Sequence, residues 1–239
     1  QAVMMRTTKL IAGALVAAGL VTAQAADITG RVTLKGTPPA EKDLPLDPSC
    51  GKLWPNEKPK TRFYVVGAEN GLGDTFVYLR KAGLTTPAPS KPQLLDQKGC
   101  EYLPYILGLQ AGQKLLVRNS DPVLHNVHAT PKINKEFNLA QMAGGKDIER
   151  VFDQPEVFVR FKCDVHPWMF AYVGVLPHSY HAVTDKDGKF KIEGVPAGKY
   201  TLVAFHRKSH VTEDKAITQE VEVSDKPVTA NFTVEVAAQ

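Results

Sequence analysis

The chain has 239 residues, of which 43% are hydrophobic and 23% charged, and its formal net charge is +4. This length allows one large β domain or two modest ones, and the composition is that of a folded globular protein, not a disordered or collagen-like one. The weak positive charge comes without a Lys/Arg cluster interleaved with aromatic residues, which argues against a nucleic-acid groove.

The first 25 residues have the pattern of a secretory signal peptide. Arg6 and Lys9 form a short positive region, residues 10–21 are apolar, and Ala23-Gln24-Ala25 is a small-x-small cleavage site. The apolar run is short for a membrane span, although a retained anchor is the alternative. We expect a mature periplasmic or secreted chain that starts near Ala26 and needs no membrane.

Short alternating segments broken by Gly, Pro and Asp follow, without a convincing helical period. Strands are predicted at residues 28–34, 62–66, 75–80, 103–110, 114–118, 148–152, 157–162, 170–176 and 199–205. Residues 183–192 are typical of a hairpin with an Asp- and Gly-rich turn, and residues 216–236 of two closing strands. The pattern predicts an all-β protein with two sandwich-like units.

The segments between these strands carry weaker signals. Residues 37–60 are rich in Pro and Lys and are expected to be irregular. Residues 85–92 contain three prolines and are typical of a linker. Residues 138–147 have room for one short helix at most.

One short segment carries most of the chemistry. Cys163, His166 and Met169 offer a thiolate, an imidazole and a thioether at positions i, i+3 and i+6, and His125 lies at the end of an earlier segment. Soft sulfur with imidazole suits copper, and a trigonal His₂Cys set with a long axial Met is the electron-transfer form of such a site. Singly each residue has an ordinary structural explanation, but together they predict a copper site.

His128 is an alternative donor. His125 and His128 are three residues apart, so on a strand their side chains face opposite sides and both do not bind one ion.

The three cysteines are informative if the chain is exported, because two of them would pair in an oxidising compartment. If Cys163 binds metal, Cys50 and Cys100 remain as the disulfide. A Cys100–Cys163 disulfide would abolish the site, and the sequence does not decide between them. A Cys-x-x-Cys-His motif is missing, which argues against c-type haem.

Residues 117–176 resemble the cupredoxins, most closely the amicyanin type of blue copper protein. That family combines His-Asn-Val-His, here residues 125–128, with Cys-x-x-His-Pro-aromatic-Met, here residues 163–169. The resemblance extends over residues 91–176 and implies a Greek-key sandwich or barrel. It makes His125, not His128, the ligand.

The same resemblance implies roles around a single type 1 copper ion. Asn126 is expected beside the thiolate as a hydrogen-bonding group that tunes the site. The ligand loop is expected to face solvent, so that Pro167, Trp168 and Phe170 dock a redox partner protein.

A second resemblance is to the transthyretin-like, carboxypeptidase-regulatory-like β-sandwich. Residues 183–190 and 195–202 match its Val-Thr-Asp-x-Asp-Gly-x-Phe and Val-Pro-x-Gly-x-Tyr-x-Leu motifs, and residues 30–38 fit its first strand. It implies a discontinuous domain, residues 27–84 and 177–239, with the copper module of residues 85–176 inserted. Two tandem domains are the alternative.

The sequence thus favours an exported one-electron carrier that is not an enzyme. A non-redox copper or zinc protein is one alternative, and a cell-surface interaction protein with a decayed site is another. A thiol nucleophile at Cys163 with His166 as its base is disfavoured, because three-residue spacing in a tight loop suits convergence on one ion and no orienting Asp or Asn is identified.

Overall fold

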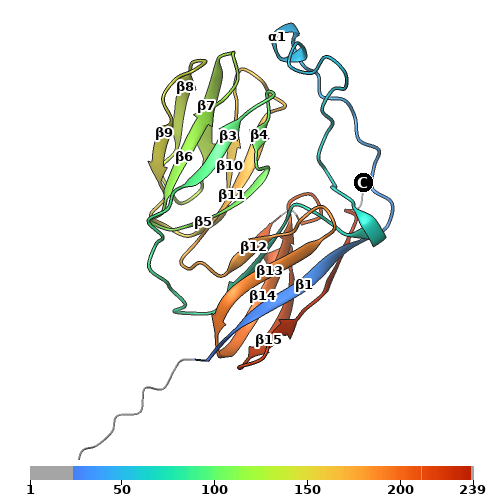
Figure 1. Ribbon diagram of the computed structural model, residues 1–239, viewed down its shortest axis with the longest axis vertical. Coiled ribbons are helices and arrows are strands. Elements are labelled where there is room, and N and C mark those ends of the chain that lie inside the picture. The colour runs from blue at the N-terminus through green and yellow to red at the C-terminus, as the bar shows by residue number, and fades with distance from the viewer. Residues whose placement is uncertain (1–23, 211, 238–239) are drawn as a thin grey trace, which may run out of the picture.

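The computed structural model describes residues 24–210 and 212–237, and most of its regular elements are β-strands (Figure 1). The predicted all-β fold is confirmed. The predicted signal peptide lies almost wholly in residues 1–23, outside the described residues. The helical elements of the described ranges are α1 (Pro48–Gly51), η1 (Ala68–Asn70) and η2 (Glu213–Lys215), and none of them is long and apolar enough to cross a membrane.

The first sandwich is built from strands at both ends of the chain. One sheet contains β13 (Lys189–Pro196), β1 (Ala25–Lys35), β16 (Val228–Thr229) and β17 (Phe232–Glu235). The other runs in the order β12 (His181–Val183), β2 (Thr75–Arg80), β14 (Gly198–His206) and β15 (Ile217–Val223). Their inward residues, such as Ile28, Leu79 and Leu202, share one apolar core.

The second sandwich contains the strands that lie between β2 and β12 in the chain. One sheet runs in the order β4 (Tyr102–Leu103), β3 (Gln93–Gln97), β6 (Lys114–Asn119) and β9 (Ile148–Val151). The other runs in the order β5 (Ile106–Gln110), β11 (Phe170–Leu176), β10 (Glu156–Lys162), β7 (His125–Thr130) and β8 (Phe137–Gln141). Figure 1 shows this sandwich as a separate layer pair next to the first.

Strand β7 shows how the period of two positions the site. Its residues alternate between buried and partly exposed, starting with a buried His125. His128 therefore lies on the opposite face from His125, as the alternation of side chains along a strand requires.

The two sandwiches meet through a close contact that depends on glycine. Gly108 of β5 and Gly174 of β11 are opposite one another in register. A Cβ atom at position 174 would lie 2.4 Å from the Phe76 ring, and one at position 108 would lie 2.0 Å from the His181 ring. Glycine in these strands thus lets the sheets approach closely.

The long connection between β1 and β2 extends from the first sandwich to the second (Figure 1). Cys50 in α1 forms a disulfide with Cys100, with an S–S distance of 1.95 Å and a Cα–Cα distance of 5.8 Å. Both cysteines belong to the core of the second sandwich, against which Leu46 and Leu53 also pack. The irregular segment predicted from its prolines therefore covers one end of that sandwich.

Three local predictions are wrong. Residues 62–66 form no extended strand but only an isolated bridge between Val66 and Leu72. Residues 137–141 form strand β8, in a stretch where no strand and at most one short helix was expected. The turn within residues 183–192 is present, but it joins β12, which pairs with β2, to β13, which pairs with β1, so it is not a hairpin.

Candidate metal centre

The predicted donors come together at one end of the second sandwich. His125 is the first residue of β7, and the loop from β10 to β11 carries the other donors. Two hydrogen bonds fold this loop tightly, from the Cys163 N–H to the Met169 carbonyl at 3.1 Å and from the Met169 N–H to the His166 carbonyl at 2.9 Å. The loop is short and bonded at both ends, so its side chains converge.

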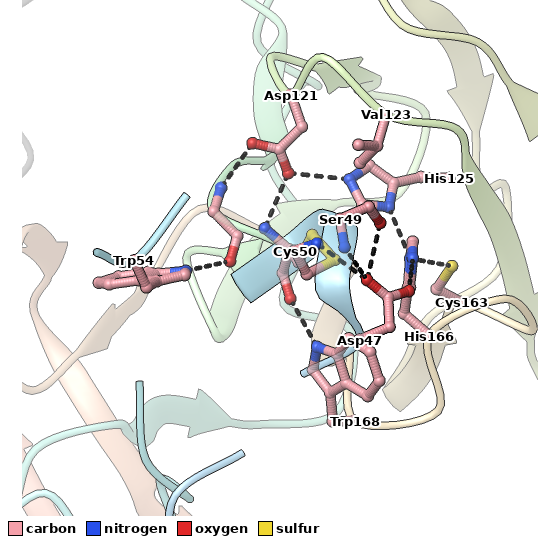
Figure 2. Close-up of a disulfide and its surroundings, with 12 residues drawn as sticks. Asp47, Ser49, Cys50, Trp54, Asp121, Val123, His125, Cys163, His166 and Trp168 are labelled. Carbon is pink, nitrogen blue, oxygen red and sulfur yellow. Dashed lines mark hydrogen bonds and ion pairs between the residues drawn. A yellow bond between two sulfur atoms is a disulfide. The ribbon is translucent and has the colours of Figure 1, made fainter. Parts of the chain in front are cut away.

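Three of the donor atoms face one another directly (Figure 2). The Nδ1 atoms of His125 and His166 are 3.0 Å apart, and the Cys163 Sγ lies 3.7 Å from the His166 Nδ1. One donor atom from each of the three residues lies within 4.8 Å of the others. At most 2% of each residue is exposed. Buried polar atoms need a partner, and a metal ion held between these three donor atoms would satisfy all of them.

Met169 is the fourth predicted donor. It is 1% exposed and belongs to the same buried cluster as Cys163. The soft thioether and thiolate with two imidazoles form a donor set that suits copper, and the residues present fit that ion.

The thiolate form of Cys163 is favoured by its surroundings. Burial alone raises the pKa of this thiol, but hydrogen bonds from His125 and from backbone N–H groups outweigh burial and hold the pKa below its usual range. One of them is the Asn126 N–H, which donates to Sγ at 3.3 Å. The Asn126 side chain acts elsewhere, since its Oδ1 accepts from the Asp164 N–H at 3.0 Å. Asn126 therefore contacts the sulfur through its backbone.

The outer nitrogen of each histidine faces a carboxylate. The His125 Nε2 is 2.8 Å from Asp121 Oδ2, and the His166 Nε2 is 3.3 Å from Asp47 Oδ2. A carboxylate on the far nitrogen fixes the ring and leaves Nδ1 facing the centre. Sequence reasoning identified no orienting acid and missed both. Asp121 lies in the connection between β6 and β7, and Asp47 lies in a segment expected to be irregular.

The two histidines differ in their electrostatic environment. Burial lowers the pKa of His125, yet its hydrogen bond to the Asp121 carboxylate and the nearby Cys163 outweigh burial and leave the pKa raised. Burial and the neighbouring His125 lower the pKa of His166. Burial opposes ionisation of Asp121, but His125 and the N–H groups of Gly99 and Cys100 keep its pKa below the usual value.

His128 takes no part in the centre. Its Nδ1 lies 2.8 Å from Asp164 and its Nε2 lies 2.8 Å from Glu136, both on the outer face of the sheet. The alternative donor is therefore held by two carboxylates away from Cys163.

The residues predicted to dock a partner differ in exposure. Pro167 is exposed, whereas Trp168 and Phe170 are half-buried. The Trp168 Nε1–H donates to the Cys100 carbonyl at 3.1 Å, and the ring centroids of Trp168 and His166 are 5.2 Å apart. An apolar cavity of about 180 Å³ lies beside them, and its walls include Leu44, Phe63, Tyr105, Trp168 and Phe170.

The histidines of the first sandwich have a different role from the one expected. His206 and His210 lie near Arg207 and Lys208 in the sequence, which predicts a solvated edge, but only 3% and 7% of the two histidines are exposed. Their rings stack on Tyr64 and Phe205, respectively. That prediction is wrong because β14 (Gly198–His206) is buried on both faces over its last five residues, His206 included.

Comparisons with known proteins find matches only among solved structures. No known family and no curated protein matches the chain. A purple cupredoxin from Nitrosopumilus maritimus is 24% identical, with 35% of this chain and 98% of that one covered and a TM-score of 0.30. A reduced amicyanin variant is 22% identical, with 35% and 81% covered and a TM-score of 0.31. A copper-containing nitrite reductase from Thermus scotoductus is 18% identical, with 41% and 25% covered and a TM-score of 0.33. The structural neighbours are thus cupredoxins and a copper enzyme, at a similarity that carries no functional conclusion for this chain.

Proposed function

We propose that this chain is an exported type 1 copper protein that carries single electrons between redox partner proteins. The observation that supports it is the buried convergence of His125, Cys163 and His166, whose donor atoms lie within 4.8 Å of one another. The thioether of Met169 in the same loop completes the donor set for copper.

A bound copper ion would supply a one-electron change between two oxidation states. The protein's contribution is to hold the donors so that little rearrangement accompanies that change. The end of β7 and the hydrogen-bonded loop present the donors from two fixed places, and Asp121 and Asp47 face the outer nitrogens of the two histidines. The N–H of Asn126 keeps the sulfur oriented.

Catalysis by Cys163 as a nucleophile is less well supported. The residue is 2% exposed and lies beneath His166 and His125, so a substrate carbonyl would not reach the sulfur. A non-redox zinc or copper site remains the competing function, because the same three donors bind those ions. The thioether favours copper, since it is a soft ligand.

Addition of Cu(II) to the metal-free protein tests the proposal. We expect an intense visible thiolate-to-copper band that disappears on reduction and returns on oxidation. Cys163→Ser should lose the band, whereas His128→Gln should keep it, because His128 lies on the other face of β7. A pale copper complex of the unmodified chain would contradict the electron-carrier function and favour the non-redox one.

The other parts of the chain receive supporting roles in this proposal. Pro167 and the outer edges of Trp168 and Phe170 would form the docking surface for a redox partner protein. The first sandwich would be a transthyretin-like scaffold into which the copper module is inserted. The disulfide supports export, because such bonds persist in oxidising compartments.

A further inference from the structure

The outer edge of His166 is covered by a distant part of the chain. The side chain of His166 is 3% exposed. Its cover is the segment around α1, whose Cys50 forms the disulfide with Cys100, and a donor atom from each of these cysteines and from His166 lies within 4.8 Å of the others. Asp47 is the residue of this segment that meets the imidazole, as Figure 2 shows.

Asp47 is held in place by hydrogen bonds that do not involve His166. Its Oδ1 accepts hydrogen bonds from the Ser49 N–H at 2.9 Å, the Cys50 N–H at 2.8 Å and the Ser49 hydroxyl at 2.7 Å. These bonds cap α1 and leave Oδ2 free to face the His166 Nε2 at 3.3 Å. One oxygen is therefore structural, and the other is available to the imidazole.

A carboxylate bonded to backbone N–H groups also faces the other histidine. Asp121 uses Oδ1 for the Gly99 N–H at 2.6 Å and Oδ2 for both the Cys100 N–H and His125 Nε2, each at 2.8 Å. The residues held by Asp121 and Asp47 are thus linked through the Cys50–Cys100 disulfide. Both carboxylates orient a ring so that Nδ1 faces Cys163.

We propose that Asp47 is a positioning residue for His166, and that the Cys50–Cys100 disulfide holds Asp47 next to this ring. This inference rests on the proposed metal function but not on the identity of the metal or on redox activity. Asp47 holds the ring through Nε2–H, raises its basicity toward a cation and separates it from water.

Four variants separate this role from helix capping. Asp47→Ser keeps a good N-cap but loses the oxygen that reaches His166. Asp47→Ala loses both, Asp47→Glu keeps the carboxylate, and Ser49→Ala removes a neighbouring hydroxyl without touching His166. The affinity of each for Zn(II) and for Cu(II) is measured by chelator competition, together with the Nε2–H proton resonance of His166 in the metal-free protein.

We expect Asp47→Ser and Asp47→Ala to lose affinity about 10- to 100-fold and to lose the slowly exchanging Nε2–H signal, as removal of such a partner does. Asp47→Glu should restore most of the affinity and Ser49→Ala should leave it unchanged. If copper binds, Asp47→Ser and Asp47→Ala should lose affinity for Cu(II) more than for Cu(I), because the carboxylate favours the more positive ion. Their reduction potential should then rise by about 59 mV for each factor of ten by which the loss of Cu(II) affinity exceeds the loss of Cu(I) affinity.

Wild-type affinity in Asp47→Ser, or an equal loss in Ser49→Ala, would show that Asp47 only caps α1 and would overturn the inference. The Zn(II) and proton measurements are independent of colour. A colourless copper complex would therefore refute the proposed function and leave this inference standing.

Discussion

Removal of the Cys50–Cys100 disulfide should affect stability and the metal site together. The two cysteines are 50 residues apart in the chain. Loop-closure entropy for a loop of that length gives about 4 kcal/mol of stabilisation at 25 °C, through restriction of the unfolded chain. We therefore expect Cys50→Ala/Cys100→Ala to lower the free energy of unfolding by about that amount.

Urea denaturation of the metal-free protein, followed by tryptophan fluorescence, measures this change. Cys163→Ala is the matched control, since it removes a buried sulfur that forms no disulfide. A decrease below about 1 kcal/mol, or one equal to that of the control, would refute the entropic reasoning. The double variant should also bind Zn(II) less tightly, because α1 then no longer holds Asp47 on His166.

Three further predictions concern packing, pH and the second carboxylate. Gly174→Ala should lower stability by about 1 to 3 kcal/mol in thermal unfolding, because the new Cβ lies 2.4 Å from the Phe76 ring, whereas Gly51→Ala has open space and should be nearly neutral. Burial lowers the pKa of His206 to about 3. As the pH falls, this histidine is therefore protonated in the unfolded chain before it is protonated in the folded one. The free energy of unfolding should drop by about 3 kcal/mol from this histidine between pH 7 and pH 4.5. His206→Gln should flatten that part of the profile in urea titrations, and an unchanged slope would contradict it. Asp121→Asn should weaken Zn(II) binding about 10- to 100-fold in chelator competition, and unchanged binding would remove its orienting role.

The parts of the site that could be predicted from sequence are the local ones. Cys163, His166 and Met169 lie in one tight loop, so their spacing already implies convergence. The alternation of a strand excludes a site that uses both His125 and His128, and the resemblance to the cupredoxin motif selects His125. Asp47 is far from His166 in the sequence, and its contact depends on the disulfide and the path of the connection, which no local pattern reveals.

The fold shows the same division. Alternation identified most strands, but β8 was missed because its buried position is polar. Gln141 is 2% exposed and donates to the Val117 carbonyl at 3.0 Å, so polar bonds replace the apolar residue that the pattern requires. The turn of residues 183–192 was recognised from Asp and Gly, yet turn chemistry does not reveal which strand each arm pairs with. Sheet pairing is a long-range property.

Gly108 and Gly174, at the contact between the two sandwiches, connect the loop of residues 163–169 to the first sandwich. Strand β11 begins directly after Met169. Its Gly174, five residues after Met169, packs against the Phe76 ring of β2. Strand β11, which follows the loop of residues 163–169, thus packs between the cores of the two sandwiches. A fragment limited to residues 85–176 would present Ile106, Tyr172 and Leu176, which share a buried cluster with Phe76, to water. The sandwich that carries the candidate metal centre is therefore not a detachable module, and the placement of His125, Cys163 and His166 depends on both halves of the molecule.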